Sequence, residues 1–113
     1  MFKQLEIRWV DLNPTKGAET QKQRPCVIIQ SDLINNGSQT FIVASILPNH
    51  KDWPFAVNIN PSKANGLDKE RHINLKQLRA VDKSRIKNKL GKLETIYKKN
   101  IENSLNIIFD LYA

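Results

Sequence analysis

The sequence predicts an α+β fold that is mainly β, in which several short strands form a small curled sheet or barrel and one helix packs on it. Two patterns carry this prediction. Up to about residue 81, apolar residues alternate with polar ones or form short β-branched runs, as strands do. From Leu93 onward, apolar residues recur every three or four positions, which is the spacing of one face of an amphipathic helix.

The first strand is predicted around Leu5, Ile7 and Trp9, which alternate with Glu6 and Arg8 and are expected to share a core-facing side. A polar loop follows and ends at residue 24. The remaining elements are strands at 25–29, 40–46, 55–59, 72–75 and 78–81, with a turn at 35–38.

The carboxyl-terminal helix is predicted from Leu93 to Tyr112, and Gly91 marks the break before it. One helix cannot cover every edge of a sheet, and an uncovered edge is available for pairing. We therefore expect a homodimer.

Length and composition predict a single domain spanning residues 1–113, with 40% hydrophobic and 26% charged residues. The single cysteine cannot form an internal disulfide or a Cys-rich zinc site, so stability is expected to come from packing. The charged start and the absence of any apolar run of roughly 20 residues argue against a signal peptide and a membrane partner. We expect a cytoplasmic protein.

Positive charge is concentrated in one segment. The chain has a net charge of +7, and residues 69–92 alone hold nine basic and two acidic side chains. Such a segment attracts nucleic acid, an anionic membrane or an acidic protein, although improved solubility explains it equally well.

The loop from Asn13 to Arg24 has no aliphatic side chain larger than alanine, so it is expected to face water or a ligand. Arg24 directly precedes Pro25, which favours an extended backbone there. A guanidinium held in this way can bind a phosphate through two donors. An ordinary surface arginine is the alternative interpretation.

Other chemically capable residues give weaker signals. His50 and His72 are suited to acid–base chemistry, but they lack a partner motif and any metal-ligand spacing. Cys26 is predicted to be a buried structural thiol. Trp53 is either a rim residue or a platform on which a nucleobase stacks. The sequence has no glycine-rich phosphate loop and no helical HxxxH pair, so we expect no metal and no cofactor.

The order of these motifs resembles the MazF/PemK toxin family. The matching stretches are IRWVDLNPTKGAE at 7–19, RPCVIIQ at 24–30, Asn35, FIVA at 41–44, WPF at 53–55, KQLRAVDK at 76–83 and LGKL at 90–93. They are spread over essentially the whole chain.

The resemblance implies a small SH3-like β-barrel with a carboxyl-terminal helix, acting as a homodimer. It also implies the toxin of a type II toxin–antitoxin module, a metal-independent endoribonuclease that cleaves single-stranded mRNA at short motifs and halts translation and growth. The implied partners are an acidic antitoxin and, for the toxin–antitoxin complex, promoter DNA.

In that family the ribose 2′-hydroxyl attacks the adjacent phosphate and leaves a cyclic phosphate and a free 5′-hydroxyl. The resemblance assigns catalytic roles to Arg24 and Glu19. It places Gln77 and Arg79 on the strand that lines the groove as RNA-positioning residues, and we expect Lys16, Thr20, Gln21 and Lys76 to bind RNA as well.

Two positions depart from the family pattern. Leu47 stands where many members have a threonine or serine, and Lys76 stands where an acidic residue is usual. Ser45 and His50 are possible substitutes for the missing hydroxyl. An alternative is therefore a catalytically weak or inactive member that binds an antitoxin or nucleic acid. Gyrase poisoning by a related fold depends on a terminal Trp-Gly-Ile, which this chain lacks.

Overall fold

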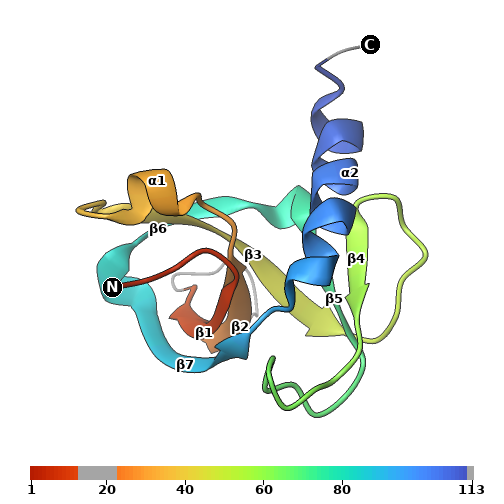
Figure 1. Ribbon diagram of the computed structural model, residues 1–113, viewed down its shortest axis with the longest axis horizontal. Coiled ribbons are helices and arrows are strands. Elements are labelled where there is room, and N and C mark those ends of the chain that lie inside the picture. Colours follow the sequence, from red (N-terminus) through yellow and green to blue (C-terminus); the bar gives the residue numbers. More distant parts are fainter. Residues whose placement is uncertain (13–22, 112–113) are drawn as a thin grey trace, which may run out of the picture.

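The computed structural model of the protein describes residues 1–12 and 23–111. Within these ranges the strands follow one another and a carboxyl-terminal helix ends the fold (Figure 1). The strands are β1 Glu6–Asp11, β2 Gln23–Ile28, β3 Thr40–Pro48, β4 Ala56–Ile59, β5 Arg71–Asn74, β6 Arg79–Asp82 and β7 Ile86–Lys92. The helices are α1 Asp32–Asn35 and α2 Lys98–Phe109, with 3-10 turns η1 Leu75–Gln77, η2 Lys83–Arg85 and η3 Thr95–Tyr97.

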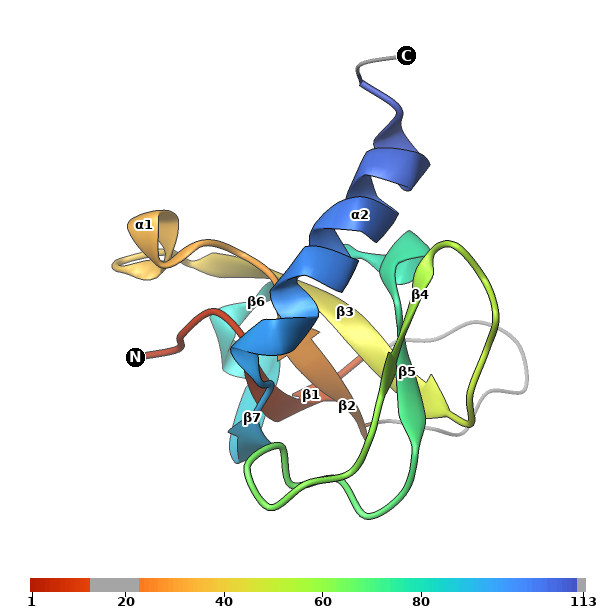
Figure 2. The same ribbon diagram turned by 45° about the vertical axis from the view of Figure 1, so that its right-hand side comes forward.

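All strand pairs are antiparallel, and the sheet runs in the order β4-β5-β3-β2-β1-β7. The long strand β3 has two partners on one side, because residues Thr40–Val43 pair with β6 and Ile46–Pro48 pair with β5. The sheet therefore curls, and α2 crosses it (Figures 1 and 2). These features confirm the α+β prediction of a curled sheet with a terminal helix.

Two apolar clusters pack on the two sides of the central strands. The larger one joins the sheet to α2 and includes Ile7, Val27, Ile46, Ile73 and Ile101. The second contains Val10, Cys26, Ile28, Phe41, Val43, Val81 and Ile86. Cys26 is fully buried there, as predicted.

Trp9 belongs to neither cluster and lies at the rim of the core rather than within it. The pairing of β1 with β7 shows register shifts between Ile7 and Arg8 and between Arg8 and Val10, but the regular pairing with β2 keeps Ile7 and Trp9 on one face. Trp9 lies beyond the edge of the larger cluster and is 36% exposed, while Val10 belongs to the second cluster and is completely buried.

Strand β7 was not predicted, because lysines and an asparagine interrupt its apolar pattern. It lies at the end of the strand order, where charged side chains are common. Gly91 lies inside this strand, so the predicted break at that residue is also wrong. A Cβ atom at Gly91 would clash with the backbone of Asn65, which shows that close backbone packing requires glycine here.

The terminal helix begins later than predicted. Leu93 is buried in the segment before η3, and α2 starts at Lys98. Ile101 is the most deeply buried apolar residue of α2, while Leu105 and Ile108 are partly buried against the same cluster. No helix among the described residues has the length and apolar character needed to cross a membrane.

Candidate nucleic-acid interface

A row of cross-strand partners connects the residues singled out in the sequence. Cys26 of β2 pairs with Ser45 of β3, and the same register continued by two residues places Arg24 opposite Leu47. Leu47 pairs in turn with His72 of β5. Side chains that lie directly opposite in an antiparallel pair share one face of the sheet. Arg24, Leu47 and His72 are therefore aligned on the same face.

Arg24 is half-buried at the start of β2. It helps to line a hollow of about 470 Å³, whose other polar lining residues are Gln23, Asp68 and Arg71. The Arg71 guanidinium donates a hydrogen bond of 3.2 Å to Asp68, whereas no carboxylate within the described ranges forms an ion pair with Arg24. Trp9, Pro25 and Ile46 also line this hollow. Alternation along the strands puts their side chains on the other face of the sheet from Arg24, so the hollow does not place a phosphate at the Arg24 guanidinium.

Arg24 and Arg79 both act electrostatically on the buried thiol of Cys26. Burial raises the pKa of Cys26 to about 11, while the Ser45 hydroxyl and the positive charges of Arg24 and Arg79 act in the opposite direction. Arg79 is exposed at the first position of β6 and pairs with Val43. Two arginine charges therefore act on the same face of β2 and β3.

The proposed substitute Ser45 is buried, with 5% of its surface exposed, and its Oγ lies 3.9 Å from the sulfur of Cys26. It shares the face of Leu47, as expected from its position two residues earlier in β3. Because Ser45 is buried, its hydroxyl is not exposed on the surface that carries Arg24.

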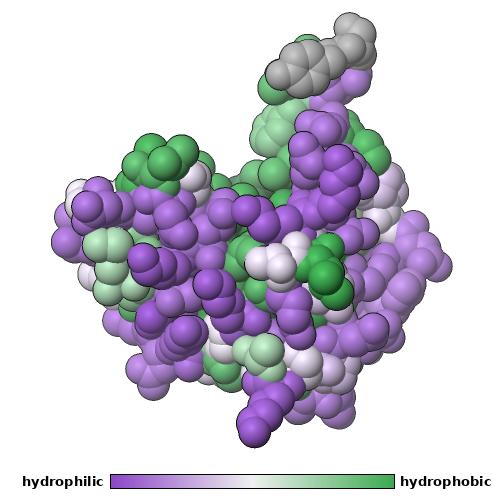
Figure 3. All heavy atoms as spheres, viewed as in Figure 1, coloured by the Kyte–Doolittle hydropathy of each residue, from purple (hydrophilic) through white to green (hydrophobic). Residues whose placement is uncertain are grey.

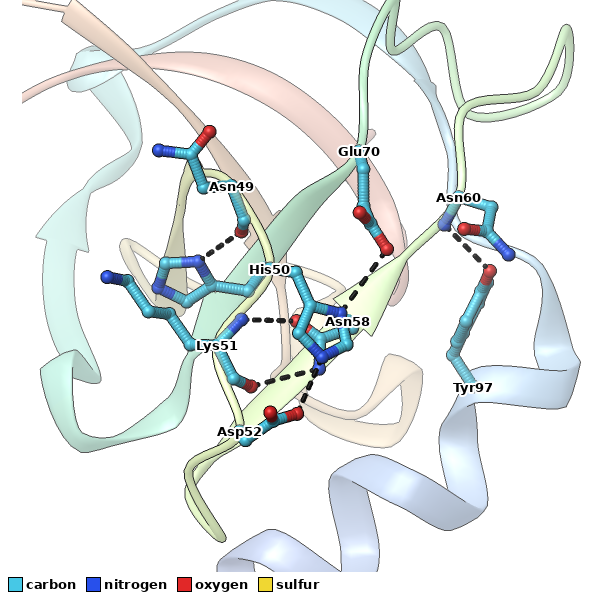
Figure 4. A network of polar contacts seen from close by, with 9 residues as sticks. Asn49, His50, Lys51, Asp52, Asn58, Asn60, Glu70 and Tyr97 are labelled. Atoms are coloured by element: carbon cyan, nitrogen blue, oxygen red, sulfur yellow. Dashed lines mark hydrogen bonds and ion pairs between the residues drawn. The ribbon is translucent and has the colours of Figure 1, made fainter.

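The other proposed substitute, His50, lies in the loop after β3 and contacts two acidic side chains (Figure 4). Its Nε2 is 2.6 Å from Asp52 Oδ1, and its Nδ1 is 3.3 Å from Glu70 Oε2. Hydrogen bonds to Asp52 and Glu70 raise the pKa of this exposed imidazole, so its protonated form is favoured.

His72, the other histidine considered for acid–base chemistry, lies in β5. It is 3% exposed, and its Nδ1 lies 2.8 Å from the carbonyl oxygen of Asn49. Because a carbonyl oxygen only accepts, Nδ1 carries the hydrogen and donates it. The buried Nε2 has no hydrogen-bond partner among the described residues.

Lys76 and Gln77 are exposed on η1, the short turn between β5 and β6. The Asn74 side chain caps this turn by accepting a hydrogen bond of 3.0 Å from the Lys76 backbone. The Lys76 ammonium lies 4.9 Å from the centre of the Phe55 ring. Lys76 therefore adds a positive charge beside an aromatic group.

The basic segment is divided by the fold. Arg71, Lys76 and Arg79 belong to β5, η1 and β6, which flank β3. The others after them belong to η2 and β7, beyond β1 in the strand order: Lys83, Arg85, Lys87, Lys89 and Lys92. The basic residues of this segment therefore lie on two different parts of the surface.

Four of the predicted residues, Lys16, Glu19, Thr20 and Gln21, lie outside the described residues. Within the described ranges no group of three or more histidine, cysteine, aspartate or glutamate side chains has a metal-binding arrangement.

Comparison with known proteins identifies close relatives. A family model for PemK-like, MazF-like toxins of type II toxin–antitoxin systems matches residues 3–109. The chain is 39% identical over 115 residues to the endoribonuclease MazF of Staphylococcus saprophyticus, with 100% of this chain and 95% of that protein covered. It is 38% identical over 113 residues to the Staphylococcus epidermidis protein of the same name, covering 98% of this chain and 93% of that protein.

Solved structures share the fold. A mycobacterial endoribonuclease in complex with its cognate antitoxin matches with a TM-score of 0.81 at 15% identity, covering 100% of this chain and 99% of that one. MazF of Deinococcus radiodurans matches with a TM-score of 0.76 at 17% identity, covering 96% of each chain.

Proposed function

This chain belongs to the family of PemK-like, MazF-like toxins of type II toxin–antitoxin systems, and on that premise we propose that it is an endoribonuclease that cleaves single-stranded RNA. The full-length similarity to proteins named endoribonuclease MazF carries the proposal. The half-buried Arg24, which forms no ion pair with a carboxylate in the described ranges, supports it.

In the proposed reaction the ribose 2′-oxygen attacks the adjacent phosphorus, and the bond from phosphorus to the 5′-oxygen breaks. The 2′-hydroxyl loses a proton, and the leaving 5′-oxygen gains one. Negative charge accumulates on the phosphoryl oxygens in the transition state, where fixed donors stabilise it most. Arg24 would supply these donors, and Arg79 would hold a neighbouring phosphate. Glu19 remains the predicted proton-transfer group.

Leu47 cannot donate a hydrogen bond or carry a proton, so we assign it no chemical role. Phosphate stabilisation by Arg24 would then provide the main catalytic effect. The alternative of an inactive binding protein is not favoured, since the two close relatives are both named as endoribonucleases.

The direct test is incubation of the purified protein with a long single-stranded RNA in the presence of EDTA. We expect discrete fragments that end in a cyclic phosphate and begin with a 5′-hydroxyl. RNA that stays intact at micromolar protein concentration would contradict the proposal.

Arg79 should contribute to RNA binding through a phosphate. Each phosphate contact on a single strand contributes roughly 0.7 to the slope of log affinity against log salt concentration. We expect Arg79→Ala to reduce this slope by about 0.7. Titration of a 2′-O-methyl oligonucleotide, which cannot be cleaved by the proposed chemistry, measures it. Lys99→Ala on α2 is the control, and an equal slope for both variants would place the RNA elsewhere.

We also propose an acidic antitoxin as a partner. The net charge of +7 is complementary to an acidic peptide, and one structural neighbour is an endoribonuclease in complex with its cognate antitoxin. Binding of promoter DNA by the toxin–antitoxin complex stays a prediction that none of these comparisons tests.

A homodimer is the third part of the proposal, and an exposed apolar surface supports it. Leu33 and Ile34 of α1 are 93% and 60% exposed. Ile107, Phe109 and Leu111 at the end of α2 are exposed as well. Figure 3 shows hydrophobic atoms over α1 and along α2 on one face of the molecule. We call these five residues the α1–α2 apolar surface, since exposed apolar patches mark protein interfaces.

Leu33→Asp should weaken this dimer at least about tenfold, because a charge would be buried without a partner. Sedimentation equilibrium over a range of protein concentrations measures the change. Ile96→Asp is the matched control, since Ile96 is 75% exposed in η3 and lies outside the α1–α2 apolar surface. Equal dimerisation of wild type and Leu33→Asp would exclude this surface as the interface.

A further inference from the structure

The loop between β3 and β4 carries a stacked aromatic pair with a positive charge on each side. The ring centres of Trp53 and Phe55 are 5.1 Å apart, and their planes differ by 26°. The Lys51 ammonium lies 5.1 Å from the centre of the Trp53 ring, and the Lys76 ammonium lies 4.9 Å from that of Phe55. Trp53 is 42% exposed, so this cluster lies at the surface.

The framework holds this loop in place before any ligand binds (Figure 4). Asn58 of β4 exchanges two hydrogen bonds of 3.0 Å with the backbone of Lys51. His72, the cross-strand partner of Asn58, donates to the Asn49 carbonyl and meets the Trp53 ring edge-on at 5.8 Å. A platform fixed in advance loses less conformational entropy when it binds a ligand.

The pair is also close to the proposed cleavage site. His72 pairs with Leu47, and the register of β2 and β3, continued two residues past the pair Cys26–Ser45, brings Arg24 opposite Leu47. Two strand spacings, roughly 10 Å, therefore separate the backbones at Arg24 and His72. This spacing allows the platform to act on a nucleotide near the bond to be cleaved.

We propose that the Trp53–Phe55 pair is a subsite for one unpaired nucleobase of the RNA, an inference that rests on the proposed function. The base stacks on the exposed indole of Trp53 and displaces the Lys51 ammonium from that ring. The long side chain of Lys51 then turns toward a phosphate, so the same lysine neutralises the backbone. Aromatic stacking between flanking cations matches the chemistry of single-stranded nucleic acid, which alternates flat bases with negative phosphates.

The test measures the binding of 2′-O-methyl heptamers of U, of A and of C, and of copies with one abasic position moved along the chain. Wild-type protein should lose affinity about 5- to 100-fold when the abasic position falls on the platform. Trp53→Ala should bind the intact heptamer about 5- to 100-fold more weakly than wild type does. It should lose no further affinity when the abasic position falls on the platform. Trp53→Phe should restore part of the difference.

Ile96→Ala, which removes another exposed apolar side chain, should keep the wild-type response to the abasic position. The inference is overturned if Trp53→Ala binds the intact heptamer as tightly as wild type does. It is also overturned if Trp53→Ala loses the same affinity at every abasic position, or if wild-type protein binds none of the heptamers. Because these probes are not cleaved, the result is independent of nuclease activity. Base-dependent binding without RNA cleavage would contradict the proposed function and leave the subsite standing.

Discussion

Replacing Arg24 with alanine is expected to reduce the rate of RNA cleavage by about 10²- to 10³-fold, the usual effect of removing a group that stabilises transition-state charge. Arg24 is half-buried at the start of β2 and forms no ion pair with a carboxylate in the described ranges. Its guanidinium is therefore available to the phosphate. Single-turnover cleavage of a labelled RNA measures the effect.

Arg24→Lys is the informative companion, because lysine keeps the charge but cannot donate two parallel hydrogen bonds. We expect it to retain some activity while remaining well below wild type. Arg71→Ala is the matched control, since Arg71 is another partly buried arginine but already binds Asp68. Unchanged cleavage by Arg24→Ala, with the fold intact, would remove Arg24 from the mechanism.

Gly66→Ala is expected to destabilise the protein by about 2–5 kcal/mol. Gly66 has φ +75°, and a Cβ atom there would meet the carbonyl oxygen of Leu90. The variant therefore combines an unfavourable backbone conformation with a clash against the backbone of β7. Urea denaturation followed by circular dichroism gives the change in the free energy of unfolding.

Two other glycines separate these causes. Gly37 has φ +77° but no atom within 4 Å of the added Cβ, so Gly37→Ala should cost only about 1–2 kcal/mol. Gly91 has the clash without the positive φ, and Gly91→Ala should cost about 1–3 kcal/mol. Equal destabilisation by Gly66→Ala and Gly37→Ala would show that β7 shifts to make room for the added methyl group at little cost in free energy.

The sequence predicted most strands because their burial follows a simple pattern. Val57 and Ile59 of β4 are buried as their alternation indicated. The errors occur where contacts between distant segments decide the structure. Trp9 lies on the face of Ile7 but beyond the edge of the larger core cluster, and β7 is held by β1 rather than by its own composition. Neither interaction is visible in a local pattern.

The candidate site shows the same division. Arg24 could be selected from the polar loop and its proline, but its alignment with Leu47 and His72 depends on strand register, which the sequence does not reveal. The stacking of Trp53 on Phe55 was not predicted, since the alternation pattern assigned Phe55 to a strand and Trp53 to a loop. The cations beside the two rings come from different elements, which only the folded chain brings together.

The lysines of β7 have a consequence for the protein as it accumulates in a cell. This strand ends the sheet, and Lys87, Lys89 and Lys92 place like charges along it. Two copies that approached through this border would repel each other before their backbones could hydrogen-bond. Free molecules therefore resist joining into fibres, even when nothing else covers that side of the barrel.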